Sequence, residues 1–207
     1  MEPLDGLVLA GGQSRRLGLD KGLVRFGGVP LLRIVVERVA QVCRDVVVAV
    51  DRPDRYENLR LPARLVADES PGLGPLSGLQ VGLRTCRTEH VLVAASDLPF
   101  LNVELLRHMA RLPRSYQALV PWRDGRWQPL HAIYARSCLE AVDVMAAAGG
   151  GSMEELLGRL KMQGLHEEDM EGLDPNGLSL LNLNERSDLD RARGLWKRLR
   201  RQEAARQ

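Results

Sequence analysis

The sequence is poor in the features that define several classes of protein. Aromatic residues make up 4% of its 207 residues, cysteine occurs three times, and 29 basic residues nearly balance 27 acidic ones for a formal net charge of +2. No apolar run approaches the roughly 20 residues of a membrane-spanning helix, and the balanced charge creates no overall field that would attract nucleic acid or a membrane surface. We therefore expect neither as a partner and expect local groups to bind any charged ligand.

The cysteines exclude two ways of stabilising a small protein. Cys43, Cys86 and Cys138 are far apart and form no C-x-x-C pair, so they indicate neither a disulfide framework nor a zinc site and are predicted to be buried free thiols. A chain of this length removes about 70% of its unfolded surface from water without such links. We expect one domain over residues 1–207 and a cytoplasmic location, because residues 1–5 lack the basic start of a signal peptide.

The first half of the chain alternates short β-branched runs with longer segments of helical period. Strands are predicted at residues 4–10, 45–50, 63–66 and 90–95. Helices are predicted at residues 30–43, 53–59 and 75–86, each opened by a proline, which suits a first helical turn. The strands are mostly apolar throughout, which is typical of strands buried on both faces. This order predicts βαβ crossovers in a parallel sheet with helices on both sides.

The second half predicts additional antiparallel strands. Residues 118–122 and 126–134 flank Asp124 and Gly125, a strong hairpin signal. Asn102 is expected to cap a helix that runs to residue 110, and a capping box from Ser152 to Glu155 begins another. Two further helices are predicted at residues 136–148 and 187–201.

A glycine-rich loop follows the first strand directly. Residues 9–18 read LAGGQSRRLG, and Lys21 comes three residues later. Glycines at the carboxyl end of a strand let backbone N–H groups approach an anion, while the nearby arginines and Lys21 can neutralise a triphosphate. The loop matches neither the P-loop pattern nor G-x-G-x-x-G, so those two nucleotide-binding classes are disfavoured. The alternative interpretation is an ordinary glycine-rich turn with solvated arginines.

At this point the sequence resembles the molybdenum cofactor guanylyltransferases. Four segments carry the resemblance in order: residues 9–23 (LAGGQSRRLGLDKGL), residues 68–78 (DESPGLGPLSG), residues 96–100 (SDLPF) and residues 181–184 (LNLN). The resemblance implies an α/β fold, the Rossmann-like three-layer αβα nucleotidyltransferase fold, with a mostly parallel central sheet and added antiparallel strands in the second half. It implies a nucleotide-binding half over residues 1–100 and an acceptor-side half over residues 101–207.

The resemblance also implies roles for individual residues. Nucleotide binding is implied for Leu9, Ala10, Gly11, Gly12, Lys21, Asp68 and Asp97. Catalytic roles are implied for Lys21, Asp97 and Arg15, and Asp97 would bind Mg²⁺. Some members carry an asparagine where this chain has Ala49, so we expect no side-chain contact there. The alternative for Asp97 is a cap for the helix near Asn102.

The implied reaction transfers GMP from GTP to the terminal phosphate of the molybdopterin cofactor and releases pyrophosphate. GTP and the molybdopterin cofactor would be its partners, with molybdoenzymes or other cofactor-biosynthesis proteins as further ones. Two alternatives stay open: a related nucleotidyltransferase that uses CTP or acts on a sugar phosphate, and a catalytically silent GTP-binding module that delivers the cofactor.

The sequence offers weaker candidates in its second half. Trp122 and Trp127 flank the hairpin turn and are either a stacking platform for a flat pterin or a cross-strand pair that stabilises the hairpin. Arg126, Gln128 and His131 are candidates for the pterin side.

The C-terminal part leaves two further alternatives. Asn182 and Asn184 would share one face of a strand, or else cap the last helix. That helix is rich in arginine and is predicted to dock through its apolar positions with a solvated basic face, while an acidic partner is the alternative.

Overall fold

The apolar runs of the first half form the centre of one mixed sheet. The computed structural model describes residues 2–11, 20–68, 70 and 72–204. The strands are β1 (Asp5–Leu9), β2 (Arg25–Phe26), β3 (Val29–Pro30), β4 (Val46–Val50), β5 (Arg64–Ala67), β6 (His90–Ala95), β7 (Ala118–Arg123), β8 (Arg126–Trp127), β9 (His131–Ala135) and β10 (Met162–Leu165). The α-helices are α1 (Leu31–Val39), α2 (Pro75–Thr85), α3 (Val103–Arg111), α4 (Leu139–Ala147), α5 (Met153–Leu157), α6 (Glu167–Met170) and α7 (Arg186–Ala204).

The main sheet has the strand order β10-β7-β9-β6-β1-β4-β5, and β8 pairs with β7. Strand β1 pairs in parallel with both β4 and β6, and β4 pairs in parallel with β5. Strand β9 runs antiparallel to β6 and to β7, whereas β10 pairs in parallel with β7. The prediction of a mostly parallel sheet with antiparallel strands added by the second half is therefore confirmed.

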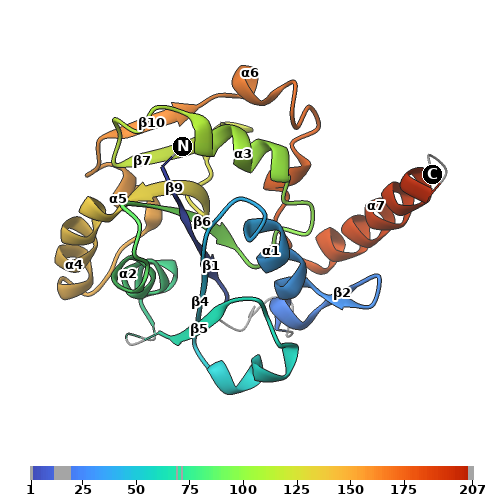
Figure 1. Ribbon diagram of the computed structural model, residues 1–207, viewed down its shortest axis with the longest axis horizontal. Coiled ribbons are helices and arrows are strands. Elements are labelled where there is room, and N and C mark those ends of the chain that lie inside the picture. Colours follow the sequence, from blue (N-terminus) through green and yellow to red (C-terminus); the bar gives the residue numbers. More distant parts are fainter. Residues whose placement is uncertain (1, 12–19, 69, 71, 205–207) are drawn as a thin grey trace.

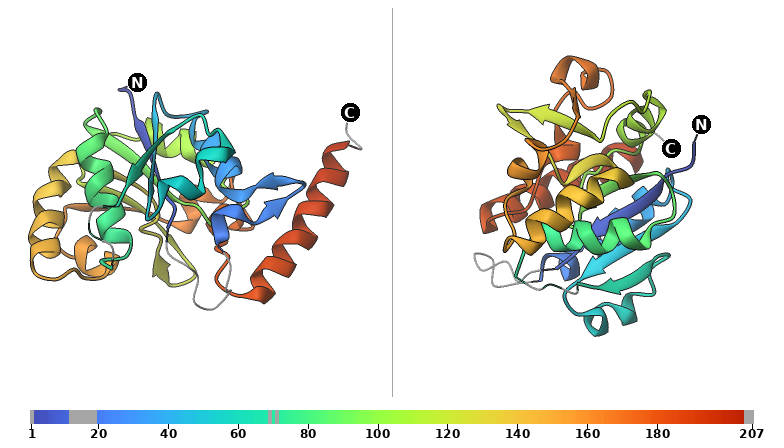
Figure 2. Two further views of the ribbon diagram at one scale, coloured as in Figure 1. Left: turned by 90° about the horizontal axis from the view of Figure 1, so that it is seen from below. Right: turned by 90° about the vertical axis from the view of Figure 1, so that its left-hand side faces the viewer.

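Helices cover both faces of this sheet. Figure 1 shows α1 and α3 on one side and α2 and α4 on the other, and Figure 2 shows the same layers from two further directions. Two separate apolar clusters correspond to the two faces: α1, α3 and α7 contribute to one, and α2, α4 and α5 contribute to the other. This three-layer arrangement is the predicted fold class.

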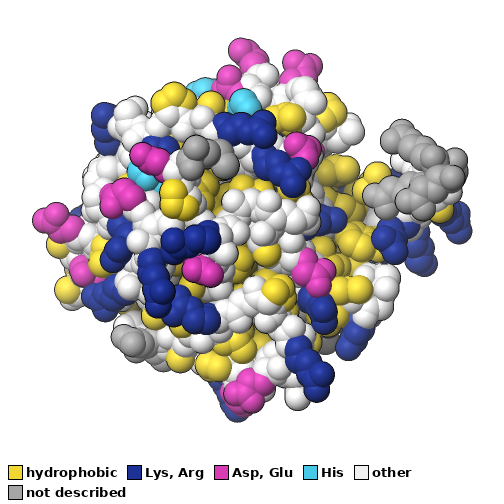
Figure 3. All heavy atoms as spheres, viewed as in Figure 1, with side chains coloured by type: hydrophobic (Ala, Val, Ile, Leu, Met, Phe, Trp, Pro, Cys, Tyr) yellow, Lys and Arg dark blue, Asp and Glu magenta, His cyan; other side chains and the backbone are white. Residues whose placement is uncertain are grey.

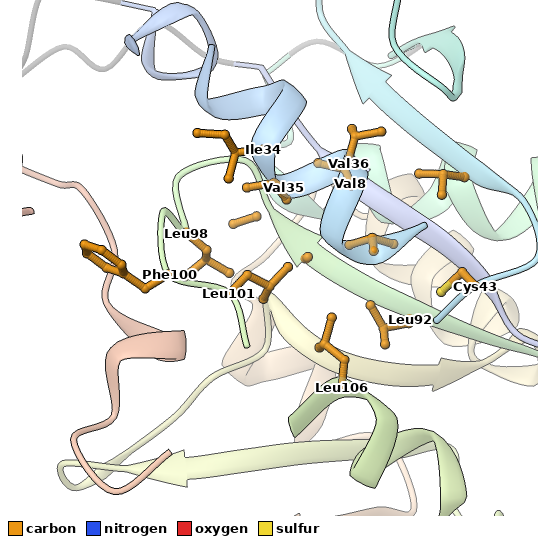
Figure 4. Packing of buried hydrophobic residues seen from close by; sticks show 14 of the residues in the cluster. Val8, Ile34, Val35, Val36, Cys43, Leu92, Leu98, Phe100, Leu101 and Leu106 are labelled. Carbon is orange, nitrogen blue, oxygen red and sulfur yellow. The ribbon is translucent and has the colours of Figure 1, made fainter. Parts of the chain in front are cut away.

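The packing of α1 and α2 explains why these segments are helical and where they lie. Helix α1 buries Ile34, Val35 and Val36 against the sheet, where they meet Val8 and Leu92 in the cluster drawn in Figure 4. Each fully buried aliphatic side chain contributes about 1.5–3 kcal/mol. On the other face, glycine lets α2 approach β1 closely, because a Cβ on its buried Gly82 would clash with Leu7.

One predicted helix is wrong. Residues 53–59 form two 3₁₀ turns, η2 (Pro53–Arg55) and η3 (Glu57–Leu59), instead of an α-helix. The segment is mostly polar and buries little besides Tyr56, so it lacks the apolar stripe that holds a surface helix in place. Arg60 then ends the second turn in the left-handed region with φ of 46°.

The predicted strand over residues 126–134 is interrupted. Strand β8 ends at Trp127, and β9 begins at His131, because Pro129 between them has no N–H to donate to a ladder. The Asp124–Gly125 turn itself is confirmed, since both residues have positive φ and lie between β7 and β8. The helix predicted from residue 136 begins with the 3₁₀ turn η4 (Arg136–Cys138) before α4.

Helix α7 docks through its apolar side. Trp196 packs against Phe26 and Phe100 with ring centroids 5.5 and 6.1 Å apart, and the Arg38 guanidinium lies 5.8 Å from the centre of its ring. The far end of α7 projects beyond the body of the molecule (Figures 1 and 2). On the face drawn in Figure 3, basic and acidic side chains are interspersed, in agreement with the balanced composition.

The three cysteines are free and buried, as predicted. Burial raises the pKa of the Cys86 and Cys138 thiols to about 12, so both stay protonated at neutral pH. Among the helices of the described residues, none is both long and apolar enough to cross a membrane.

Candidate functional site

A cleft opens where four neighbouring parallel strands end. Strands β6, β1, β4 and β5 lie side by side, and a cavity of about 580 Å³ lies at their carboxyl ends. Open α/β sheets bind ligands at this edge, and the volume falls within the range of small-molecule sites. The charged lining residues, among those described, are Asp20, Lys21, Asp51, Asp68 and Asp97.

Lys21 and Asp97 meet inside this cleft. The Lys21 ammonium lies 2.8 Å from Asp97 Oδ2 and donates a second, longer hydrogen bond of 3.4 Å to Asn184 Oδ1. The Lys21 and Asp97 side chains are 20% and 15% exposed, so the pair is partly shielded from water. The structure thus joins two residues that are 76 positions apart in the sequence.

The backbone around Lys21 is fixed by the residue before it. Asp20 caps the 3₁₀ turn η1 (Lys21–Leu23): its Oδ1 accepts a hydrogen bond of 3.0 Å from the Gly22 N–H. The other carboxylate oxygen accepts a 2.7 Å hydrogen bond from the Tyr56 hydroxyl. Burial and the Asp20 carboxylate raise the pKa of Tyr56, so the hydroxyl remains a donor. The turn that carries Lys21 is therefore tied to the segment that follows β4.

Asp68 holds the second glycine-rich segment. It follows β5, and its Oδ1 accepts hydrogen bonds from the Ser70 N–H at 2.9 Å and from the Ser77 hydroxyl on α2. Helix α2 begins after Gly74, whose φ of 63° suits glycine, and Pro75 occupies the first turn. The N-terminus of α2 therefore borders the cleft, where helix N–H groups favour an anion.

Asp97 does not cap the helix that follows it. Asn102 caps α3, because its side chain accepts hydrogen bonds from the N–H groups of Glu104 and Leu105. The Asp97 carbonyl accepts a 3.2 Å hydrogen bond from the Leu183 N–H, which brings the segment with Asn184 to the cleft. The strand interpretation of this segment is wrong, since residues 181–184 form no strand.

The first turn of α7 is linked by Asp188 to the residues just before it. Asp188 accepts hydrogen bonds from the N–H groups of Asn184 and Glu185 at 2.9 and 2.8 Å. Asn184 Oδ1 accepts its hydrogen bond from Lys21 and not from an N–H group at the start of α7.

The oxygens around Lys21 suit a hard divalent cation. Asp97 Oδ2 and Asn184 Oδ1 converge on one ammonium group, so the position already accommodates a positive charge. Mg²⁺ usually takes one or two protein carboxylates and completes its shell with water and phosphate oxygens. Within the described residues, no group of three or more His, Cys, Asp or Glu side chains could hold a metal ion without such help. The donors present therefore fit Mg²⁺ bound together with a phosphate ligand.

The predicted site residues fall into two groups. Leu9, Ala10 and Gly11 line the cleft together with Lys21, Asp68 and Asp97. Gly12 and Arg15 lie outside the described residues. Ala49 also lines the cleft, with a methyl group only.

The pterin-side candidates do not join this cleft. His131 is 2% exposed and faces the core, which corrects its prediction as a ligand contact. Burial lowers the pKa of His131 to about 4, so it is neutral near pH 7. Among the described residues that line the cleft, neither Arg126 nor Gln128 is present.

Trp122 and Trp127 pair across the hairpin. Their rings lie edge to face, with centroids 4.6 Å apart. This geometry favours the interpretation that they stabilise the hairpin.

Sequence reasoning missed Asp51 and the contact between Asp20 and Tyr56. Asp51 follows the apolar strand β4 and lines the cleft beside Gly11, so an acid directly after a buried strand was an available signal. The contact of Asp20 with Tyr56 joins residues 36 positions apart and has no local pattern.

The chain is similar to known proteins over most of its length. The family model described as "MobA-like NTP transferase domain" matches residues 6–163. A Nostoc sp. protein named "Probable molybdenum cofactor guanylyltransferase" is 38% identical over 161 residues, which cover 76% of this chain and 78% of the relative. "Molybdenum cofactor guanylyltransferase" of Syntrophotalea carbinolica is 31% identical, with 93% and 90% of the two chains covered.

A solved structure is similar over nearly the whole chain. The crystal structure of molybdopterin-guanine dinucleotide biosynthesis protein A from Archaeoglobus fulgidus superimposes with a TM-score of 0.82 at 28% identity. The match covers 94% of this chain and all of the other.

Proposed function

The chain belongs to the MobA-like NTP transferase family, and on this premise we propose that it transfers GMP from GTP to the terminal phosphate of the molybdenum-molybdopterin cofactor. Its relatives are named for guanylyl transfer, the cleft has the volume for a nucleoside triphosphate, and Lys21 supplies a cation at one end of it. The protein is a nucleotidyltransferase of molybdenum cofactor biosynthesis.

In the proposed reaction, an oxygen of the cofactor's terminal phosphate attacks the α-phosphorus of GTP. A new phosphoanhydride bond forms, the bond from the α-phosphorus to the β-phosphate oxygen breaks, and pyrophosphate leaves with the electron pair. The reaction requires no protein nucleophile, so the protein contributes orientation and charge neutralisation.

Each part of the site has a task in this reaction. The Lys21 end of the cleft would bind the phosphates, and Leu9, Ala10, Gly11 and the N-terminus of α2 would line the rest of the nucleotide. The Ala10 N–H already donates to the Ala49 carbonyl, so Ala10 would contribute contact rather than a hydrogen bond. The Lys21 ammonium would follow the negative charge that moves onto the leaving pyrophosphate. Arg15 is proposed to act beside Lys21, and Gly12 and Asp68 to contact the nucleotide.

The proposed metal is Mg²⁺. Asp97 would bind it, with Asn184 Oδ1 as the neighbouring oxygen donor. When bound, the ion would neutralise triphosphate charge and so favour attack at phosphorus.

The observation that carries the proposal is the 2.8 Å contact of Lys21 with Asp97 within the cleft. The test is incubation with GTP, Mg²⁺ and the molybdopterin cofactor, followed by measurement of pyrophosphate and of the guanine dinucleotide product. CTP and ATP run in parallel as controls. Faster reaction with CTP would indicate a cytidylyltransferase, and GTP binding without pyrophosphate release would indicate a delivery module.

We also propose a division of labour within one domain over residues 1–207. Residues 1–100 would bind the nucleotide, because most of the cleft lining comes from them. Residues 101–207 would receive the acceptor, and molybdoenzymes or other cofactor-biosynthesis proteins would take the product. A cytoplasmic location is proposed because the reaction consumes GTP.

A further inference from the structure

Asp51 places a carboxylate at one end of the cleft. It is the first residue after β4, and it lines the cleft next to Gly11 of the glycine-rich loop. The two segments are in close contact, since a Cβ on Gly11 would lie 3.1 Å from the Asp51 backbone nitrogen. A ligand bound over Gly11 therefore passes beside Asp51.

The strand order separates Asp51 from the phosphate end of the cleft. Asp97 follows β6 and Asp51 follows β4, with β1 between these strands. Two inter-strand spacings amount to roughly 10 Å. Lys21 contacts Asp97 and thus marks the end where phosphates are favoured, whereas a carboxylate repels phosphate. The Asp51 end suits the part of a nucleotide that carries hydrogen-bond donors.

The other carboxylates near this end already have donors. Asp68 accepts hydrogen bonds from Ser70 and Ser77, and Asp20 accepts them from Gly22 and Tyr56. Asp51 has a looser partner: Arg55 Nη1 lies 3.7 Å from its Oδ2, and the Asp51 side chain is 32% exposed. That separation exceeds hydrogen-bond distance, so the carboxylate can still accept two N–H groups.

We propose that Asp51 selects guanine by accepting hydrogen bonds from its N1–H and 2-amino groups. This inference rests on the proposed function and names the residue that would distinguish guanine from other nucleobases. Guanine presents these two donors side by side, which matches the two oxygens of one carboxylate. Cytosine and adenine offer an acceptor beside a single donor, so a carboxylate disfavours them.

The test measures nucleotide affinity by thermal stabilisation and calorimetry, without requiring turnover. The nucleotides are GTP, ITP, which lacks the 2-amino group, and XTP, which carries a carbonyl in its place. Wild-type protein should bind GTP about 10–100-fold more tightly than ITP. Asp51→Asn should lose most of this preference and gain affinity for XTP, because its amide can donate to the new carbonyl. A role of Asp51 in folding alone would not produce that gain.

Two controls separate the explanations. Asp54→Asn removes a nearby exposed carboxylate that pairs with Arg52, and it should leave the nucleotide preference unchanged. The 2′-deoxy form of GTP tests the ribose: if Asp51→Asn weakens GTP and ITP equally but spares the deoxy nucleotide, Asp51 binds the ribose and the inference is wrong. An unchanged ratio of GTP to ITP affinity in Asp51→Asn also overturns it. Selective GTP binding without pyrophosphate release would instead contradict the proposed function and leave the role of Asp51 standing.

Discussion

Replacing Tyr56 with Phe removes one hydroxyl group and tests how Lys21 is positioned. The Tyr56 hydroxyl donates to Asp20 at 2.7 Å, and Asp20 in turn caps the turn that begins with Lys21. A hydrogen bond to a charged acceptor contributes about 1.5–3 kcal/mol, and water can partly replace the donor because Asp20 is only half-buried. We expect Tyr56→Phe to lower the free energy of unfolding by about 1–2 kcal/mol, which is roughly 3–6 °C in Tm.

The same change should also affect catalysis. The turn that carries Lys21 loses its hydrogen bond to Tyr56, so we expect the kcat of GMP transfer to fall about tenfold, with a smaller change in GTP affinity. Thermal unfolding and steady-state pyrophosphate release measure the two effects.

A second tyrosine offers a matched control. Tyr116 is also buried, but its hydroxyl has no hydrogen-bond partner among the described residues. Tyr116→Phe should therefore leave stability and turnover nearly unchanged. If the Tyr56 and Tyr116 variants behave alike in both assays, the Tyr56 hydroxyl does not position Lys21 and the reasoning is refuted.

Three further predictions concern the phosphate end and the core. Asp97→Asn should lower turnover about 10²–10³-fold. Asp143→Asn is the control: it removes the α4 partner of an ion pair of the same 2.8 Å length and should leave turnover unchanged. Equal rates in the two variants would contradict the role of Asp97. Lys21→Ala should reduce kcat more than GTP affinity, and a change in affinity alone would show that Lys21 acts only in binding. Burial lowers the pKa of His131 from 6.5 in the unfolded chain to about 4 in the folded protein. The unfolded chain therefore takes up a proton first as the pH falls, so the stability that neutral His131 provides is complete above pH 6.5 and is lost as the pH falls toward 4. Between pH 7 and pH 5 the free energy of unfolding of the wild type should fall by about 2 kcal/mol more than that of His131→Leu, as measured by urea unfolding. Parallel curves of stability against pH in the two proteins would contradict this.

The sequence predicts the centre of the fold well and its edges poorly. Strands β1, β4 and β6 are mostly apolar runs, and their predicted bounds differ from the observed ones by at most one residue. The β2–β3 hairpin was missed because its two-residue strands are too short to show alternation. Strand β10 was also missed, since its sequence MQGL has no clear period and it forms through pairing with β7.

Some residues of the candidate site can be predicted from local motifs, and others depend on how distant segments pack. Local motifs indicated the glycine-rich loop, Lys21 and Asp97, because glycine and charge next to a strand end have a direct chemical meaning. The partner of Asp20 depends on how the segment after β4 packs, and no sequence pattern encodes that contact. The hairpin sequence makes His131 a candidate for the pterin side, but every residue of β9 is buried because both faces of the sheet are covered there.

The cleft contains more acid than base, yet it is proposed to bind a polyanion. Its described acidic residues are Asp20, Asp51, Asp68 and Asp97, against Lys21 as the one described base. The carboxylates of Asp20 and Asp68 are each stabilised by two hydrogen-bond donors from the protein, and Asp97 is paired with Lys21. In the proposed complex Asp97 would gain the cation and Lys21 would gain phosphate oxygens, so neither charge would be left unpaired. Among these acids Asp51 has the weakest partner, and under our proposal the N–H donors of guanine would meet it.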